Sequence, residues 1–278
     1  METIHTTIAS LKQQREMFDG LGKIYEMDST VVIRQKQIKG VETYLFTPNH
    51  AVTGKLLLYF HGGCYALGSI DSHRAMLTHF ATHLQTTILY VEYGLAPEKP
   101  YPFGVNDGLT VYREVIGGDQ EVILMGDSAG GGIVLSLLGD LQKLDIAQPE
   151  GVVLLSPWLD LKCDNTSYLT NAESDPIISK TNLEPYAHIY AGENDLKEIN
   201  PIDQPFKTFP KNLILVSESE VLFDDSNLLH GKVKEIQPES GLSVFSGQSH
   251  VWPLTDINSE ASQRAMKEIK GFLEGLGK

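Results

Sequence analysis

The stretch that decides the fold is VILMGDSAGGG, residues 122–132 in a chain of 278 residues. Its apolar start is typical of a buried strand, and the residues after the serine are typical of a helix. Gly126 and Gly130 stand two residues before and two residues after Ser128. Gly-x-Ser-x-Gly between a strand and a helix is the pattern of a nucleophile elbow, a sharp turn that exposes a serine hydroxyl. A Cβ at either glycine would collide with the neighbouring strand or helix, so the pattern predicts Ser128 as a nucleophile.

A serine nucleophile requires a general base, and the base requires an acid that orients it. His250 follows the last predicted strand in a Gly- and Ser-rich loop, which is the expected place for the base. The carboxylates behind the preceding strand are Glu218, Glu220, Asp224 and Asp225. We favour Glu220 as the acid, because Asp224 and Asp225 are placed to begin the next helix. A neighbouring carboxylate such as Asp224 remains the alternative.

Composition and charge narrow the class of protein. Apolar residues make up 41% of the chain, enough for a substantial core, and the net charge is −14. Such an acidic surface repels phosphate backbones and anionic lipid, so we expect neither nucleic acid nor a membrane as partner. Two cysteines and no basic–apolar leader favour a soluble cytoplasmic protein. His79 and His83 share a helical face without a third ligand, so we expect no metal and no cofactor.

Short apolar runs alternate with longer amphipathic ones along the chain. Strands are predicted at 31–34, 41–46, 55–60, 86–93, 121–125, 151–156, 213–216 and 243–245. Helices are predicted in the opening segment and at 72–84, 105–115, 130–144, 224–236 and 259–276. This alternation is typical of a mainly parallel sheet with helices on both faces.

Residues 158–210 interrupt the alternation. They contain no clear strand but five prolines and the aromatic residues Tyr186, Tyr190 and Phe206. An insertion of this length between two strands is more often functional than not. We interpret it as a lid over one edge of the sheet, within a single domain that spans residues 1–278.

Four motifs resemble those of the hormone-sensitive-lipase-like (bacterial type IV) esterases of the α/β-hydrolase superfamily. They are HGGCYALGS (61–69), YGLAPEKPYPFGVND (93–107), GDSAGGG (126–132) and SHVWP (249–253). The resemblance implies an α/β-hydrolase fold with an eight-stranded, mostly parallel sheet and a Ser–acid–His triad. It also implies a helical cap formed by about residues 1–30 and 158–210. Members of the family often pair as homodimers, so the resemblance adds a homodimer to the expectations.

The resemblance also implies an oxyanion hole in the glycine loop near residue 62. Its donors are backbone amides from Gly62, Gly63 and Cys64, joined by Ala129 at the start of the helix after the elbow. Cys64 stands where the family usually has a third glycine. We expect it to act through its N–H while the thiol packs; the rival reading makes the thiol the nucleophile. A second departure is Gly94, where the family usually has arginine.

These observations predict a serine carboxylesterase that hydrolyses small, short-acyl esters through an acyl-enzyme intermediate. An amidase, a lactonase or a deacetylase would use the same attack and remains an alternative. A non-catalytic ligand receptor on the same scaffold is a further alternative from a different class, but family members of that kind lack the triad histidine.

Overall fold

The computed structural model describes residues 2–51 and 54–277, in which one sheet of eight strands forms the centre. The strands are β1 (Val32–Ile38), β2 (Val41–Thr47), β3 (Lys55–Phe60), β4 (Thr87–Glu92), β5 (Glu121–Asp127), β6 (Gly151–Leu155), β7 (Lys211–Ser217) and β8 (Gly241–Phe245). Their order across the sheet is β1-β2-β4-β3-β5-β6-β7-β8. Only the pairings that involve β2 are antiparallel; the others are parallel. The predicted sheet is therefore confirmed.

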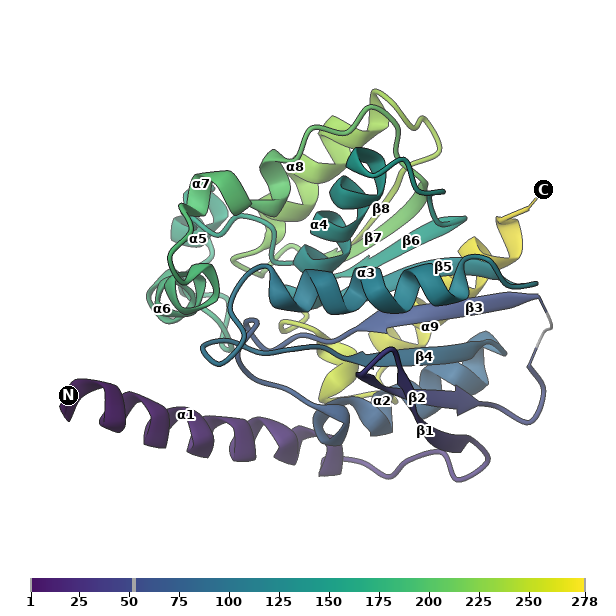
Figure 1. The fold of residues 1–278 in the computed structure, drawn as a ribbon, viewed down its shortest axis with the longest axis horizontal. Helices are drawn as coiled ribbons and strands as arrows, with labels where there is room; N and C mark the ends of the chain where they lie inside the picture. Colours follow the sequence, from purple (N-terminus) through teal and green to yellow (C-terminus); the bar gives the residue numbers. More distant parts are fainter. Residues whose placement is uncertain (1, 52–53, 278) are drawn as a thin grey trace.

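Helices cover both faces of the sheet (Figure 1). The helices of the described residues are α1 (Glu2–Asp19), α2 (Ile70–Leu84), α3 (Phe103–Val115), α4 (Ala129–Lys143), α5 (Ser167–Thr170), α6 (Lys180–Ala191), α7 (Leu196–Ile199), α8 (Phe223–Lys234) and α9 (Glu260–Gly275). Short 3-10 helices lie at Gly20–Lys23, Pro201–Asp203 and Trp252–Leu254. Helices α3, α4 and α8 pack on one face, and α2 and α9 on the other.

The central strands are apolar on both sides because each face is covered. In β3, Leu56, Leu58 and Phe60 join the core under α3 and α4. Leu57 and Tyr59, which point to the opposite face, join the core under α2 and α9. This two-residue alternation fixes the register of β3 between its parallel neighbours, since a one-residue slip would exchange the two faces.

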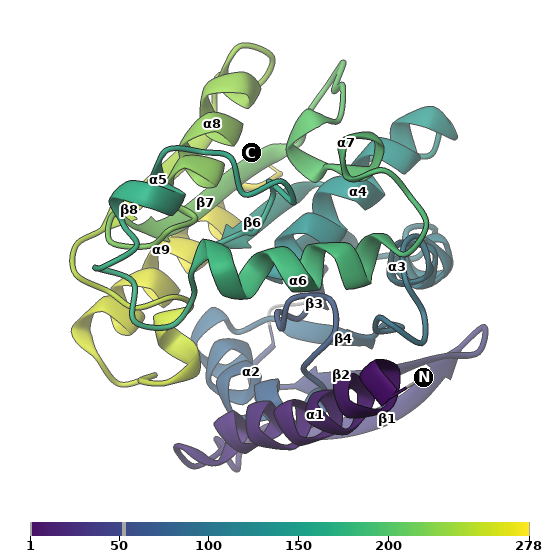
Figure 2. The same cartoon turned by 90° about the vertical axis from the view of Figure 1, so that its left-hand side faces the viewer.

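The segment between β6 and β7 contains no strand, as predicted, and forms α5, α6, α7 and a 3-10 helix. Figure 1 shows these helices gathered beyond one end of the sheet, and Figure 2 views the molecule from that end, with α6 in front of the strands. The N-terminal helix α1 lies on the same side. The parallel strands β3 to β8 present their carboxyl ends here, where the loops of such sheets form binding sites.

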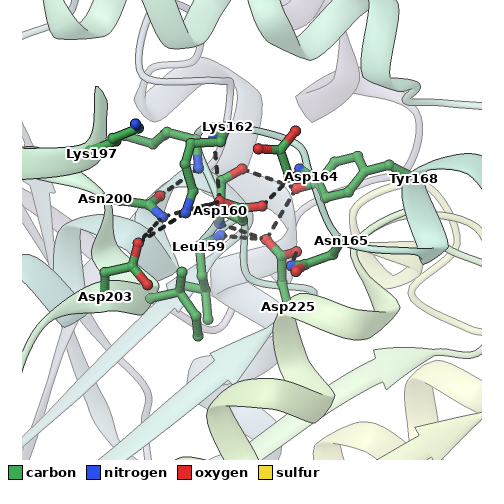
Figure 3. Close-up of polar contacts among 12 residues, drawn as sticks. Leu159, Asp160, Lys162, Asp164, Asn165, Tyr168, Lys197, Asn200, Asp203 and Asp225 are labelled. Atoms are coloured by element: carbon green, nitrogen blue, oxygen red, sulfur yellow. Dashed lines mark hydrogen bonds and ion pairs between the residues drawn. The ribbon is translucent and has the colours of Figure 1, made fainter. Parts of the chain in front are cut away.

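A buried carboxylate fastens the start of this insertion to α8 (Figure 3). Asp225, in the first turn of α8, accepts the backbone N–H groups of Leu159 and Asp160, both at 2.8 Å. It also accepts from Asn165 Nδ2 at 2.7 Å and from the Tyr168 hydroxyl at 3.1 Å. Burial raises the pKa of Asp225 to about 7, although the donors of Leu159, Asp160 and Asn165 lower it. One side chain thus satisfies four donors of the insertion.

Replacing Asp225 with alanine is expected to destabilise the fold. Two buried backbone N–H groups would lose their acceptor, at about 1–3 kcal/mol each. A protein of this size should then lose roughly 5–10 °C in Tm. Differential scanning calorimetry of Asp225→Ala beside Asp164→Asn measures this, because the Asp164 side chain is 68% exposed and its loss should change little. Equal Tm values for the two variants would refute the anchoring role.

No helix in the described part of the chain combines the length and apolar character that a membrane crossing requires.

Candidate active site

Ser128 lies at the sharp turn between β5 and α4. Its backbone φ is 49° and its ψ is −121°, a strained conformation for a residue with a side chain. A Cβ at Gly126 would lie 2.5 Å from the backbone of Gly130, and one at Gly130 would lie 2.0 Å from Phe60 O. The predicted reason for the two glycines is confirmed, because α4 and the end of β3 approach too closely for any side chain.

His250 lies between Ser128 and Glu220. Its Nε2 is 2.9 Å from Ser128 Oγ, and its Nδ1 is 2.7 Å from Glu220 Oε2. The three residues follow β5, β7 and β8, whose carboxyl ends meet at the same edge of the sheet. With the proton on Nδ1 donated to the carboxylate, Nε2 is left to accept the proton of the serine hydroxyl. The structure therefore brings together the three residues that the sequence analysis selected.

Two further groups hold Glu220 in place. Its Oε1 accepts from Ser156 Oγ and from the Ser217 N–H, both at 2.8 Å. Ser156 Oγ also lies 3.4 Å from the Val251 N–H, so it connects the acid to the residue after His250. Sequence reasoning missed Ser156, although a serine directly after a buried strand at this edge was the available signal.

The neighbouring carboxylates contact other groups. Asp224 and Asp225 lie in the first turn of α8, as predicted. Asp224 Oδ2 accepts the Ser167 N–H at 2.8 Å, and Glu218 Oε1 accepts the Ser246 hydroxyl at 2.6 Å. Glu220 is the carboxylate of this group that contacts His250.

The environment of His250 raises its pKa. Burial of the ring lowers the pKa, but the hydrogen bond to Glu220 and the charge of Glu220 raise it by more. The imidazolium is therefore favoured relative to a free histidine. This suits a base that must hold a proton during a reaction step.

The glycine loop after β3 passes directly over Ser128. A Cβ at Gly62 would lie 3.1 Å from Ser128 Cβ and 2.3 Å from Asp127 Oδ2. The Gly62 N–H donates to Asp127 Oδ1 at 3.0 Å. Because this bond occupies the N–H, Gly62 is removed from the expected set of oxyanion donors. The reason is that the elbow carries a buried aspartate just before the serine. Within residues 2–51 and 54–277, the amides of Gly63, Cys64 and Ala129 have no such acceptor.

Asp127 connects this loop to the core of the sheet. Its Oδ1 also accepts the Tyr59 hydroxyl at 2.5 Å, and its Oδ2 lies 3.4 Å from His73 Nε2. Burial raises the pKa of Asp127, but His73 and the hydrogen bond from Tyr59 lower it by more. The pKa of Asp127 is therefore below its ordinary value. A charged Asp127 thus fixes the first residue of the glycine loop.

Cys64 has a left-handed backbone, with φ of 54°, at the position where the resemblance implies glycine. Its thiol is free, and burial raises the pKa of the thiol to about 12. A thiol with so high a pKa is not a thiolate near neutral pH and is a poor nucleophile. The geometry favours the reading in which Cys64 contributes its N–H.

Replacing Cys64 with alanine should therefore preserve most of the activity, because the backbone N–H remains. The measurement is kcat/KM for p-nitrophenyl butyrate. A loss beyond about 100-fold, the size of a missing oxyanion donor, would show that the side chain matters.

Gly94 occupies a crowded position. Its N–H donates to Asp107 Oδ2 at 2.8 Å, and a Cβ there would lie 2.4 Å from Lys99 Cδ. The side chain of Lys99 fills the space beside Gly94.

The paired histidines of α2 contact protein groups. His79 Nε2 is 2.9 Å from Glu26 O, and His83 Nε2 is 3.0 Å from Gln263 Oε1. Among the residues that the structure describes, His, Cys, Asp and Glu side chains do not gather in a group of three suited to a metal ion.

Comparison with known proteins agrees with the fold. The model of a family described as alpha/beta hydrolase fold matches residues 57–254. An esterase of Acinetobacter venetianus strain RAG-1 is 27% identical over 94% of this chain and 88% of its own length. The putative acetyl-hydrolase LipR of Mycobacterium tuberculosis is 35% identical over 86% of this chain and 79% of its own. A crystal structure of an esterase from the bacterial hormone-sensitive lipase family superposes with a TM-score of 0.92 and 29% identity, covering 96% of this chain and 91% of that one.

The chain belongs to the alpha/beta hydrolase fold family, because the family model matches most of its length and the sheet has the expected architecture. Within it, the chain is grouped with the hormone-sensitive-lipase-like esterases, as its four motifs predicted.

Proposed function

We propose that this carboxylic ester hydrolase is a serine esterase in which Ser128, His250 and Glu220 form the catalytic triad. The observation that carries the proposal is the continuous chain of hydrogen bonds from Ser128 Oγ through the imidazole to the buried carboxylate. Such a chain on a strained elbow supplies a nucleophile, a base and an orienting acid.

The mechanism assigns one role to each group. His250 Nε2 takes the hydroxyl proton as Ser128 Oγ attacks the ester carbonyl carbon. Glu220 stabilises the imidazolium that results. The tetrahedral oxyanion accepts hydrogen bonds from the amides of Gly63, Cys64 and Ala129. His250 then protonates the leaving alcohol. During hydrolysis of the acyl-enzyme, His250 activates a water molecule, whose attack releases the carboxylic acid product from Ser128.

We further propose small esters with short acyl chains as substrates. The acetyl-hydrolase of Streptomyces hygroscopicus, 31% identical over 79% of this chain, and the putative acetyl-hydrolase LipR support this preference. A series of p-nitrophenyl esters from acetate to decanoate tests it. We expect kcat/KM to be highest at acetate or butyrate and to fall at least about tenfold at decanoate. Equal or higher values at decanoate would contradict it. Matched amide and lactone substrates should react more slowly than the esters.

Ester hydrolysis should depend on pH through His250. The base must be neutral, and its pKa lies above the ordinary value of 6.5, so activity should fall as the pH drops through that raised pKa. The acid limb of log kcat/KM against pH is expected to have a slope of about 1 and a midpoint above about 6.5. A midpoint below about 6 would contradict the contact with Glu220.

A further inference from the structure

The loop of the proposed oxyanion hole has a strained backbone. Gly63, Cys64 and Tyr65 have φ values of 113°, 54° and 60°. A left-handed conformation costs a residue with a Cβ on the order of 1–2 kcal/mol. Two such residues in succession persist only where the surroundings hold them. The direction of the Cys64 N–H therefore depends on contacts that lie outside the loop.

The inner end of the loop is held by the core. Asp127 accepts the Gly62 N–H, and the Tyr93 hydroxyl donates to His61 O at 2.6 Å. At the last strained residue, the Tyr65 carbonyl accepts the Ala96 N–H at 2.9 Å. The Tyr65 ring also stacks on a tyrosine of α6, with centroids 3.8 Å apart. The outer end thus rests on a second loop, residues 94–98.

Arg15 of α1 joins these two loops. Its Nε donates to Ala66 O at 2.8 Å, and its Nη2 donates to Ala96 O at 2.9 Å. The guanidinium also forms a two-pronged ion pair with Glu98, at 2.8 and 2.7 Å. In the described part of the chain, no other group donates to either alanine carbonyl. Ala66 and Ala96 are both fully buried, so each carbonyl depends on Arg15.

The rest of α1 reinforces this contact. Leu11 is 5% exposed and packs with Ala66 and Leu67, and Phe18 packs against the same cluster. Leu11, Arg15 and Phe18 are spaced i, i+4 and i+7, so one face of the helix lies on the outer end of the glycine loop. The helix is far from the loop in sequence, since Arg15 and Ala66 are 51 residues apart.

We propose that Arg15 is a positioning residue of the oxyanion hole. Arg15 holds the carbonyl groups of Ala66 and Ala96 and so supports the hydrogen bond between Ala96 and Tyr65. This bond maintains the left-handed turn and the direction of the Cys64 N–H. This inference rests on the proposed function. A lysine cannot replace Arg15, because the contact uses the planar fork of the guanidinium to reach four acceptor atoms on three residues at once.

The test compares three variants with the wild type on p-nitrophenyl butyrate. Rates are expressed per active site titrated with diethyl p-nitrophenyl phosphate, so that unfolded protein is not counted. Arg15→Lys should lower kcat about 10- to 100-fold with KM little changed, because the oxyanion forms only in the transition state. Glu98→Gln, which keeps the bonds to the two carbonyls, should lower kcat much less. Lys12→Gln, whose side chain on the same helix is 81% exposed, should resemble the wild type.

Two further readouts separate positioning from a purely structural role. The inhibition constant of a trifluoromethyl ketone, which mimics the oxyanion, should rise in Arg15→Lys by the same factor as kcat/KM falls. In a fourth variant, Arg15→Ala, added guanidinium at tens of millimolar should partly restore kcat, relative to sodium chloride at equal ionic strength.

An unchanged kcat and inhibition constant in Arg15→Lys would overturn the inference while leaving the esterase intact. Equal losses in Arg15→Lys and Glu98→Gln would also overturn it, because the ion pair alone would then be responsible. A wild-type protein without Ser128-dependent turnover would instead refute the proposed function, and this inference with it.

Discussion

Ser128→Ala is expected to lower kcat/KM for p-nitrophenyl butyrate at least about 10³-fold, by analogy with removal of the nucleophile in other triads. Without Oγ no acyl-enzyme forms, and only the oxyanion donors and substrate binding remain. The variant should stay folded, because the turn is fixed by backbone contacts: the Ser128 N–H donates to Leu155 O at 3.0 Å, and Ser128 O accepts from the Trp158 N–H at 2.9 Å.

The matched control is Ser136→Ala. Ser136 is a buried serine of α4 whose Oγ has no hydrogen-bond partner within the described part of the chain. Its loss should leave kcat/KM close to that of the wild type. More than about 1% residual activity in Ser128→Ala, with the same product and no wild-type contamination, would contradict the assignment of the nucleophile.

Glu220→Gln is expected to have the second largest effect, a loss of about 10²–10⁴-fold in kcat. The amide nearly matches the carboxylate in shape but cannot stabilise an imidazolium, and it favours the wrong imidazole tautomer. Because Glu220 raises the pKa of His250, the acid limb of the pH profile should also move to lower pH in this variant. Full pH–rate profiles of the wild type and the variant measure both effects.

Asp224→Asn is the control that decides between the two carboxylates. Asp224 accepts the Ser167 N–H instead of contacting His250, and an asparagine oxygen can accept the same bond. Its kcat and its pH profile should therefore resemble those of the wild type. A larger loss in Asp224→Asn than in Glu220→Gln would transfer the role of the acid to Asp224.

Local patterns predicted the elements of this fold well. The strands at 55–60 and 121–125 were read from apolar runs, and the structure has β3 at Lys55–Phe60 and β5 at Glu121–Asp127. Boundaries differ most for β1, predicted at 31–34 and observed at Val32–Ile38. The next example is β7, predicted at 213–216 and observed at Lys211–Ser217. Its first residue pairs with Gly151 of β6 although its side chain is polar. Backbone pairing extends the strand beyond the apolar run that a sequence reveals.

Contacts between distant segments could not be predicted in the same way. Ser156, Asp225 and Arg15 each act through hydrogen bonds that span tens of residues in the chain. Their side chains are types common on protein surfaces, and local spacing does not identify the distant groups that they contact. The bond between Gly62 and Asp127 was missed for the same reason, although both residues stand in quoted motifs. The homodimer, the cytoplasmic location, the choice of partners and the composition of the cap stay predictions.

The most direct measurement is the site of covalent labelling by diethyl p-nitrophenyl phosphate, found by intact-mass and peptide mass spectrometry. The account predicts one diethylphosphoryl group per chain, attached to Ser128, with ester hydrolysis lost in proportion to labelling and no adduct in Ser128→Ala. An adduct at Cys64, or an inactivated enzyme with Ser128 unmodified, would contradict it.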